Sequence, residues 1–373
     1  MGQSMNRLTK LSIEGFRSIR HAQIELLRLN ILIGANGAGK SNLVSFFTLI
    51  NYMTGQSLQD YVGQQGGAHS LLYRGPRRTP QIVVELAFET ETGESFLKLR
   101  LMHGAPDTLI FGEEKIAFHR QGLASPREQV LGAGHKESLL DQEASAGNNT
   151  ARVFRHLLRR CQVFQFHDTS KEARIRQAGY IDDNRHLRRD GGNLAAFLYR
   201  LQQTNEPSYR RIVVTIQQVT PFFHDFDLAP DALNPRNILL NWRERGSDYL
   251  LGPHQLSDGS LRAMALTALL LQPEDELPDV ILIDEPELGL HPAALQVLAS
   301  LLRSISVHSQ VIVATQSVPL VNHFGPEDIV VVERGEEGTT FHRQDPERLR
   351  EWLDEYTLGE LWEKNVIGGR PSR

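Results

Sequence analysis

Cysteine is nearly absent from this chain of 373 residues, which contains Cys161 alone. A single cysteine excludes an internal disulfide framework and a zinc site built from cysteines, and it suits a reducing, cytosolic compartment. The opening residues Met1–Lys10 carry no apolar segment of the kind that directs secretion. The longest uncharged apolar candidate, Ala263–Leu271, is far shorter than the roughly 18 residues that span a membrane. We therefore expect a cytoplasmic protein without a membrane segment.

Several signatures of other enzyme classes are also missing. The chain has no internal repeat, no low-complexity run, no HExxH zinc motif and no G-x-S-x-G turn of a serine hydrolase. Its 14 histidines show no spacing typical of metal ligands. The pair His167-Asp168 lacks the upstream His pair and downstream Asp of an HD-type phosphohydrolase, so that activity is not expected.

Composition indicates a globular protein with an uneven charge distribution. Hydrophobic residues make up 40% and charged residues 23% of the sequence, which predicts a large core and about two domains. The net charge of −5 argues against a chain that coats nucleic acid all over, but Ala151–Arg211 holds 13 Lys and Arg against 6 Asp and Glu. These cations either contact DNA phosphates or form a solvated face paired with Asp182, Asp183 and Asp190.

The order of strand and helix patterns predicts an α/β fold. Apolar and polar residues alternate around Leu11, and Leu29–Ile33 is typical of a buried strand, followed by a glycine-rich turn and a helix over Lys40–Met53. Two short β-branched runs with a helix between them predict central parallel strands with right-handed crossovers. These three segments are Val280–Ile283, Ala293–Ile305 and Val311–Ala314.

The other segments give a coarser prediction. It comprises a strand at Ile24–Leu26, a hairpin of Ile82–Phe88 and Phe96–Met102, loops with short elements over Gly104–Asn149, a helix at Val153–Arg160, a strand at Gln162–Phe166, a mostly helical stretch over Gly192–Val219, and a loop followed by an apolar helix over Leu256–Leu271. We expect four parts: a nucleotide-binding lobe (1–165), a helical lobe (166–260), the rest of the nucleotide-binding core (261–345) and a helical tail (346–373).

A phosphate-binding motif follows the buried strand Leu29–Ile33. The run Gly34-Ala-Asn-Gly-Ala-Gly-Lys-Ser41 matches G-x-x-x-x-G-K-[ST]. Glycines let backbone N–H groups curl around phosphate oxygens, and the helix that begins near Lys40 directs the positive end of its dipole at the anion. Lys40 can reach the β- and γ-phosphates, and the Ser41 hydroxyl can ligate Mg²⁺. The strand–loop–helix context therefore predicts a nucleoside triphosphate site.

Two carboxylates end one of the predicted central strands, in Val280-Ile-Leu-Ile-Asp284-Glu285-Pro286. Ligands of open α/β sheets bind at the carboxyl ends of the strands, so both acids are expected beside the phosphate-binding loop. Asp284 suits the Mg²⁺ shell, directly or through water. Glu285 suits the base that orients and polarises the attacking water, which indicates hydrolysis rather than storage of nucleotide. The alternative is a solvated strand end with two ordinary acids.

A third segment, Leu256-Ser-Asp-Gly-Ser-Leu-Arg262, precedes the apolar helix. Taken alone, it is either the N-cap of a core helix or a second anion site made of N–H groups at a helix start. Together with the other two motifs, in this order, it resembles the head of an ABC-type ATPase. More narrowly, the chain resembles the compact bacterial AAA-type members of the RecF, SMC and OLD branch. The resemblance rests on Gly34–Asn42, Leu256–Arg262, the run from Asp284 to Pro292, and Ile13-Glu-Gly-Phe-Arg-Ser18.

The resemblance implies a fold, a mechanism and a set of site residues. The fold is a mixed sheet core with N-terminal antiparallel strands and an inserted helical lobe. Two heads sandwich two ATP molecules, ATP closes the dimer, hydrolysis opens it, and relatives bind DNA across the closed dimer. The implied catalytic residues are Glu285, Lys40 and Gln316; the nucleotide contacts are Gly34, Asn36, Gly37, Gly39, Lys40, Ser41, Asn42 and Arg17, with Ser257 and Gly259 acting on the second copy; the Mg²⁺ ligands are Ser41 and Asp284.

Three positions depart from the family pattern or leave it open. Gln316 stands where relatives often have His, so it can hydrogen-bond a γ-phosphate but carries no charge. Asp258 stands where many relatives have Gly, which adds a negative charge near the phosphate. Both Gln165 and His167 are candidates for the Gln that relatives link to metal or water.

The spacing of the motifs and the tail complete the prediction. About 215 residues lie between Lys40 and Ser257 without a sustained heptad run, which excludes a long coiled coil, and the 56 residues after Ser317 are too few for an OLD-type nuclease domain. Thr357-x-x-Glu360 predicts a capping box for a short tail helix that bears Trp362. The tail either packs on the chain's own core or anchors a partner protein.

The sequence thus predicts a dimeric, Mg²⁺-dependent ATPase that forms ADP and phosphate. Its cycle is expected to drive DNA binding through the Arg152–Arg211 region or control of a partner effector, in DNA repair or antiviral defence. The alternative is a nucleotide-gated scaffold with little turnover that assembles a partner nuclease or toxin.

Overall fold

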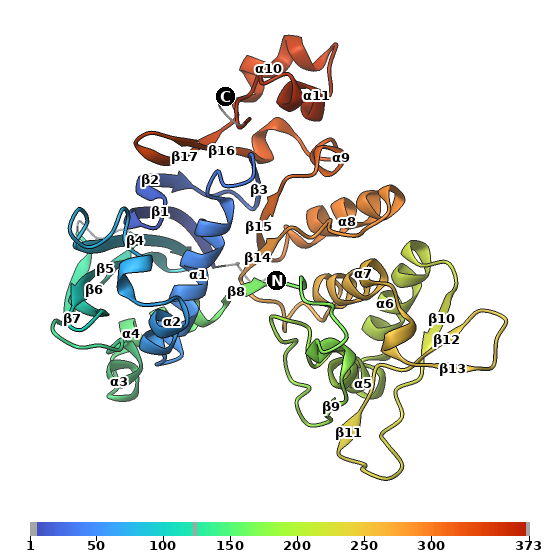
Figure 1. The fold of residues 1–373 in the computed structure, drawn as a ribbon. Coiled ribbons are helices and arrows are strands. Elements are labelled where there is room, and N and C mark those ends of the chain that lie inside the picture. Colours follow the sequence, from blue (N-terminus) through green and yellow to red (C-terminus); the bar gives the residue numbers. More distant parts are fainter. Residues whose placement is uncertain (1–5, 122–124, 371–373) are drawn as a thin grey trace. The chain divides into compact units, whose positions relative to one another are not determined.

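The computed structural model describes residues 6–121 and 125–370 and divides into two compact units (Figure 1). Unit 1 comprises Met1–Val163, Pro278–Leu282 and Ser309–Arg373, and unit 2 comprises Phe164–Leu277 and Ile283–His308. The first half of Met1–Lys10, where no targeting segment was expected, lies outside the described residues. The four-part division expected from the sequence stays a prediction.

The first sheet of unit 1 is antiparallel, and its inner strands each bury one face. Along β1, Leu11 and Ile13 are buried, whereas Glu14, the residue after Ile13, is exposed. This is the alternation expected from the sequence. The predicted hairpin is confirmed, with Thr90 paired to Gly93 at its turn. The sheet runs in the order β2 (Ile19–Glu25), β1 (Arg7–Phe16), β4 (Gln81–Thr90), β5 (Gly93–Gly104), β6 (Thr108–Arg120), β7 (Arg127–Gly132).

The expectation of loops over Gly104–Asn149 is wrong, because this stretch contains the long strand β6. Arg100 pairs with Glu113 but Leu101 pairs with Phe111, so Gly112 is an extra residue in β6. The bulge moves the buried face from odd residues, such as Phe111, to even ones, such as Glu114, and this change of phase hides the period-2 pattern. The same stretch also holds α3 (Leu140–Ser145) and the start of α4 (Asn149–Arg159).

The second sheet of unit 1 carries the predicted central strands. β3 pairs in parallel with β15 on one side and with β16 on the other, and β16 pairs with β17 in antiparallel fashion, so the sheet is mixed. The strand order is β17 (Gly338–Arg343), β16 (Ile329–Gly335), β3 (Leu29–Ile33), β15 (Gln310–Thr315), β14 (Val280–Asp284), β8 (Cys161–Phe164).

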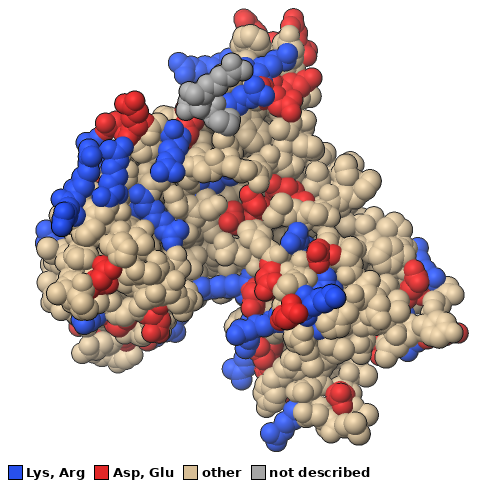
Figure 2. Space-filling view, viewed as in Figure 1, with Lys and Arg blue, Asp and Glu red and all other residues tan. Residues whose placement is uncertain are grey.

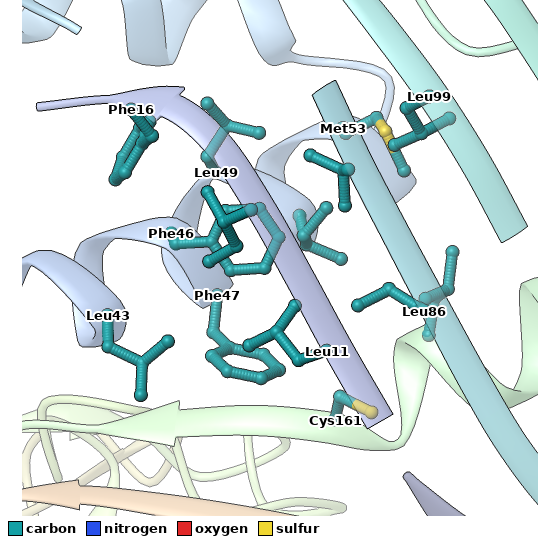
Figure 3. Packing of buried hydrophobic residues seen from close by; sticks show 14 of the residues in the cluster. Leu11, Phe16, Leu43, Phe46, Phe47, Leu49, Met53, Leu86, Leu99 and Cys161 are labelled. Atoms are coloured by element: carbon teal, nitrogen blue, oxygen red, sulfur yellow. The ribbon is translucent and has the colours of Figure 1, made fainter. Parts of the chain in front are cut away.

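Helix α1 (Lys40–Thr54) supplies the centre of the unit 1 core. Phe46, Phe47 and Leu49 point from α1 toward Leu11 of β1 and Leu86 of β4 (Figure 3). The same hydrophobic cluster includes buried side chains of β3, β14, β15 and β16, so α1 packs against both sheets. Burying one phenylalanine side chain contributes about 1.5–3 kcal/mol.

The one cysteine lies in this core (Figure 3). Cys161 is buried, and its thiol donates to the carbonyl of Leu157 at 3.3 Å. Burial raises the pKa of the Cys161 thiol far above its ordinary value, so the side chain behaves as a small apolar residue.

Helices α2 and α9 and a helical tail also belong to unit 1. The predicted capping box of the tail is confirmed, because Thr357 and Glu360 bond each other's backbone N–H groups. Leu361 and Trp362 are buried, so this part of the tail packs on the chain's own core, whereas Trp352 is 45% exposed. These elements are α2 (Leu58–Gln64), α9 (Val318–Val321), α10 (Pro346–Leu353) and α11 (Leu358–Glu363).

The helices of unit 2 lie in two segments of the chain. One segment connects β8 to β14, and the other connects β14 to β15. The expected helical stretch is confirmed as α5 (Leu194–Thr204) and α6 (Glu206–Val219), and the apolar helix as α7 (Asp258–Leu270), followed by α8 (Pro292–Ile305). Short strands join them: β9 (Gly179–Tyr180), β10 (Phe223–Phe226), β11 (Asn237–Ile238), β12 (Trp242–Glu244) and β13 (Leu250–Leu251). The predicted fold class is confirmed.

Within residues 6–121 and 125–370, every helix is too short or too polar to cross a membrane.

Candidate functional site

The glycine-rich loop lies in unit 1 between β3 and α1, as predicted. Gly37 and Gly39 adopt positive φ angles of 78° and 116°, which glycine tolerates and other residues rarely adopt. Within the described residues, no side chain caps the first turn of α1, whose N-cap is Gly39. The N–H groups of that turn therefore face the loop without a side-chain acceptor, which is the arrangement that binds an anion.

Two of the loop glycines are required by close backbone packing. A Cβ atom at Gly34 would lie 2.3 Å from the carbonyl oxygen of Val332 in β16, and one at Gly39 would lie 2.3 Å from Oγ1 of Thr339 in β17. By contrast, a Cβ at Gly37 would meet no described atom within 4 Å. The loop is thus fixed against the sheet at both ends and open at its tip.

Lys40 and Ser41 begin α1 at this loop. Lys40 is 5% exposed, and its Nζ donates to the carbonyl of Gly34 at 2.6 Å and of Ala35 at 3.2 Å. The ammonium group is therefore held at the loop by these two carbonyls, where it could also donate to a bound phosphate group. Ser41 is exposed, so its hydroxyl can reach a metal ion outside the helix.

Gln316 lies beside the loop. Thr315, the last residue of β15, pairs with Ile33, the last residue of β3, so Gln316 and Gly34 leave the sheet from neighbouring positions. An uncharged amide here can donate a hydrogen bond to a terminal phosphate.

Arg17 and Asn42 face one open pocket of about 420 Å³, which Arg74 and Arg334 also line. The guanidinium of Arg17 donates to Ser45 and Gln65, and Nδ2 of Asn42 donates to the Ser18 hydroxyl at 2.5 Å. Both side chains thus have protein partners, and their predicted contact with nucleotide stays a prediction.

The acidic pair lies at the end of β14, within unit 2. Nε2 of Gln165 donates to the carboxylate of Asp284 at 3.3 Å, whereas Nε2 of His167 lies 2.9 Å from the Asp284 main-chain oxygen. Both candidates left open by the sequence thus contact Asp284, Gln165 at its carboxylate and His167 at its main chain. Glu285 has a φ of 44°, a left-handed conformation that turns the chain sharply after the strand.

The third motif forms the N-terminus of α7 in unit 2. The Ser257 hydroxyl accepts from the N–H of Ser260 at 3.1 Å, so Ser257 is the N-cap of α7. Ser257 is exposed to solvent. A Cβ atom at Gly259 would lie 2.0 Å from the carbonyl oxygen of Gly289, so glycine is required there by the chain that follows Glu285. Arg262 reinforces this contact by donating to the carbonyls of Phe166, His167 and Leu288.

The negative charge of Asp258 is paired within unit 2. Nη2 of Arg176 donates to its carboxylate at 2.7 Å, and the same guanidinium also donates to the carbonyls of Thr169, Pro253 and Leu256. The Arg176 side chain is 6% exposed, against 63% for Asp258. The sequence did not indicate these roles of Arg176 and Arg262, because their partners are main-chain oxygens of segments distant in sequence.

Most arginines of the predicted basic region are neutralised by acids. On the visible face of unit 2, Lys and Arg lie among Asp and Glu rather than in one patch (Figure 2). Arg152 and Arg185 are exposed. Ion pairs join Arg155 and Arg159 to Asp141, Arg160 to Asp279, Arg174 to Asp190, Arg176 to Asp258, Arg188 to Asp183, Arg200 to Glu276 and Arg210 to Asp225. The paired, solvated face is the alternative that the geometry favours.

Two family models match the chain, each over just more than half of its length. One is described as an AAA domain and matches residues 10–206; the other is described as an AAA domain, putative AbiEii toxin, Type IV TA system, and matches residues 131–322. No curated protein matches the chain significantly.

Two solved structures resemble the whole chain. One is the Smc head bound to the C-winged helix domain of ScpA, with a TM-score of 0.61, 16% identity, and coverage of 91% of this chain and 99% of that chain. The other is the Smc head domain with an extended coiled coil bound to the C-terminal domain of ScpA, from Pyrococcus furiosus, with a TM-score of 0.62, 15% identity, and coverage of 94% and 99%. At these identities the likeness shows the fold, which is that of an SMC-type ATPase head.

Replacing Arg176 should destabilise the chain far more than replacing its exposed partner. Arg176→Ala leaves three carbonyls around the third motif without their donor, and we expect it to lower the free energy of unfolding by at least about 2 kcal/mol. Asp258→Ala breaks the same ion pair at its exposed end and should cost less than about 1 kcal/mol. Urea unfolding of both variants measures the difference; equal losses would contradict this account of Arg176.

Proposed function

This chain belongs to the AAA-domain family, and from that premise we propose that it binds ATP and hydrolyses it to ADP and phosphate as a head-to-head homodimer. The observation that carries the proposal is the loop between β3 and α1. Its tip is open, its helix start has no side-chain cap among the described residues, and the Lys40 ammonium already lies on its carbonyls. Gly34, Asn36, Gly37, Gly39 and Lys40 are the proposed phosphate contacts, with Gln316 toward the terminal phosphate.

We assign Mg²⁺ to the Ser41 hydroxyl and the Asp284 carboxylate. A hydroxyl and a carboxylate are oxygen donors of the kind that Mg²⁺ prefers. When bound, the ion neutralises charge on the phosphates. Glu285 is the proposed base for the attacking water, because it follows Asp284 directly where the left-handed backbone turns the chain at the end of β14.

The proposed dimer uses Ser257 and Gly259 of each copy to complete the other copy's site. Support comes from the exposure of Ser257 at the start of α7, where N–H groups and a helix dipole favour an anion. The ion pair of Asp258 with Arg176 supports it too, because the pair offsets the negative charge that this residue brings to the motif. Closure with ATP and opening after hydrolysis then follow from the γ-phosphate contact.

The cycle is proposed to control a partner effector or DNA in the cytoplasm. Because most arginines of the 152–211 region are ion-paired, DNA contact there depends on exposed residues such as Arg152 and Arg185. The description of one matching family as a putative toxin of a type IV toxin–antitoxin system supports a defence role over DNA repair. The second candidate function, a scaffold with little turnover, differs from the first in the rate of phosphate release with and without DNA.

Lys40→Ala should remove nucleotide binding. The substitution takes away an ammonium group held at the loop, and a charge-assisted bond to phosphate is worth about 1.5–3 kcal/mol, so we expect ATP affinity to fall by roughly 10- to 100-fold or more. Titration with a fluorescent ATP analogue measures this. Lys98→Ala, which removes a surface lysine paired with Glu85, is the matched control and should bind as the wild type does. Unchanged affinity in Lys40→Ala would refute the assignment of the loop.

Glu285→Gln should retain ATP binding but lose turnover. Glutamine keeps the size of the side chain but cannot accept the proton from water, and loss of a general base lowers rates by about 10²- to 10⁴-fold. Because the trapped ATP is not cleaved, the closed dimer should accumulate in size-exclusion chromatography with ATP and Mg²⁺. Glu274→Gln, in an exposed pair with His308, is the control. Equal phosphate release from wild type and Glu285→Gln would remove Glu285 from its role.

A further inference from the structure

The C-terminal tail returns to the phosphate-binding loop within unit 1. After α11, the carbonyl of Gly369 accepts a hydrogen bond from the N–H of Ala35, the second residue of the loop, at 2.8 Å. The N–H of Gly369 donates to Oε1 of Glu333 in β16, also at 2.8 Å. Gly369, which lies 334 positions after Ala35 in the sequence, thus joins the loop to β16.

This turn is built so that only glycine fits. Gly368 and Gly369 have φ angles of 82° and 83°, in the left-handed region. A Cβ atom at Gly369 would lie 2.9 Å from Cγ1 of Val331, 3.2 Å from Nε1 of Trp362 and 3.5 Å from the Cα of Gly34. A side chain at Gly369 would therefore press on Val331 and Trp362, and its Cβ would reach van der Waals distance of the first glycine of the loop.

The tail is anchored at a second point that also belongs to the site. The N–H of Gly359 donates to Oδ1 of Asn322 at 2.7 Å, and a Cβ there would lie 2.6 Å from Cγ1 of Val318. Val318 begins α9, the short helix that directly follows Gln316 and Ser317. The tail therefore contacts both segments that leave the sheet at this edge, the loop after β3 and the segment after β15.

We propose that the Gly368–Gly369 turn is a positioning element of the nucleotide site, which holds the start of the phosphate-binding loop in its binding geometry. The inference rests on the proposed binding of ATP at this loop. The turn uses the N–H of Ala35 and leaves the open tip at Gly37 and the start of α1 clear, so it supports the loop without occupying the place of the phosphates. It acts through the loop and does not touch the nucleotide.

The test compares variants that disturb the turn with variants that do not. Gly369→Ala and Glu333→Ala should raise the Kd for ATP with Mg²⁺ about 3- to 10-fold, since each weakens the bonds that fix Ala35. Glu333→Gln keeps an acceptor oxygen for the N–H of Gly369 and should restore affinity. Gly134→Ala is the matched control, because Gly134 has a similar φ of 85° but lies in open space, so it imposes the same backbone strain away from the loop.

Thermal unfolding without nucleotide separates positioning from folding. A positioning role predicts that Gly134→Ala loses stability but keeps ATP affinity, whereas Gly369→Ala loses ATP affinity even at temperatures where it remains fully folded. Wild-type affinity in Gly369→Ala overturns the inference and leaves the proposed function intact. Failure of the wild-type chain itself to bind ATP overturns both.

Hydrogen exchange of the unmodified chain gives a second test that requires no variant. Binding equilibria are reciprocal, so if the docked turn favours ATP, ATP must favour the docked turn by the same factor. Saturating ATP with Mg²⁺ should therefore slow exchange of the Gly369 N–H about 3- to 10-fold. Unchanged exchange at Gly369, together with slowed exchange in the first turn of α1, would overturn the positioning role.

Discussion

Close packing of the backbone at Gly34 and Gly39 against the neighbouring strands fixes the shape of the phosphate-binding loop. At Gly34 the loop meets the carbonyl of Val332, and at Gly39 it meets the side chain of Thr339. Both contacts would be impossible with a Cβ, so the two ends of the loop are positioned by β16 and β17 rather than by its own conformational preference. Rigid ends let the N–H groups and Lys40 face a ligand without further ordering, which lowers the entropic cost of binding.

Unit 2 uses the same kind of contact around its own motifs. Gly259 lies against the carbonyl of Gly289, so the start of α7 and the chain after Glu285 cannot move independently. Arg262 adds hydrogen bonds from α7 to the segment after β8 and to Leu288. Arg176 pairs the charge of Asp258 and fixes the carbonyls that precede α7. The start of α7, the chain after Glu285 and the segment after β8, which are separate in sequence, thus form one connected element within this unit.

Sequence patterns predicted the parts of the site that are local and periodic. The buried strand, the glycine loop and α1 are consecutive, so their spacing alone predicted the arrangement now seen from Leu29 to Thr54. Strand β6 was missed because the bulge at Gly112 changes the phase of its buried face. The two interpretations of the basic region could not be separated from the sequence, because some acids that pair with it, such as Asp141 and Asp279, lie outside the counted window. The contacts of Gly369 with Ala35 and of Arg176 with Leu256 join distant segments and leave no local pattern.

The central claim is that the loop of one copy and the α7 start of another grip one triphosphate together. A mixing experiment with two inactive variants tests it most directly. Lys40→Ala removes the loop's ammonium, and Ser257→Asp keeps an N-cap acceptor but places a negative charge where the γ-phosphate should lie. Mixed in equal amounts, the two variants can form dimers with one intact composite site, so phosphate release should return. A mixture as inactive as either variant alone would contradict a site shared between two copies.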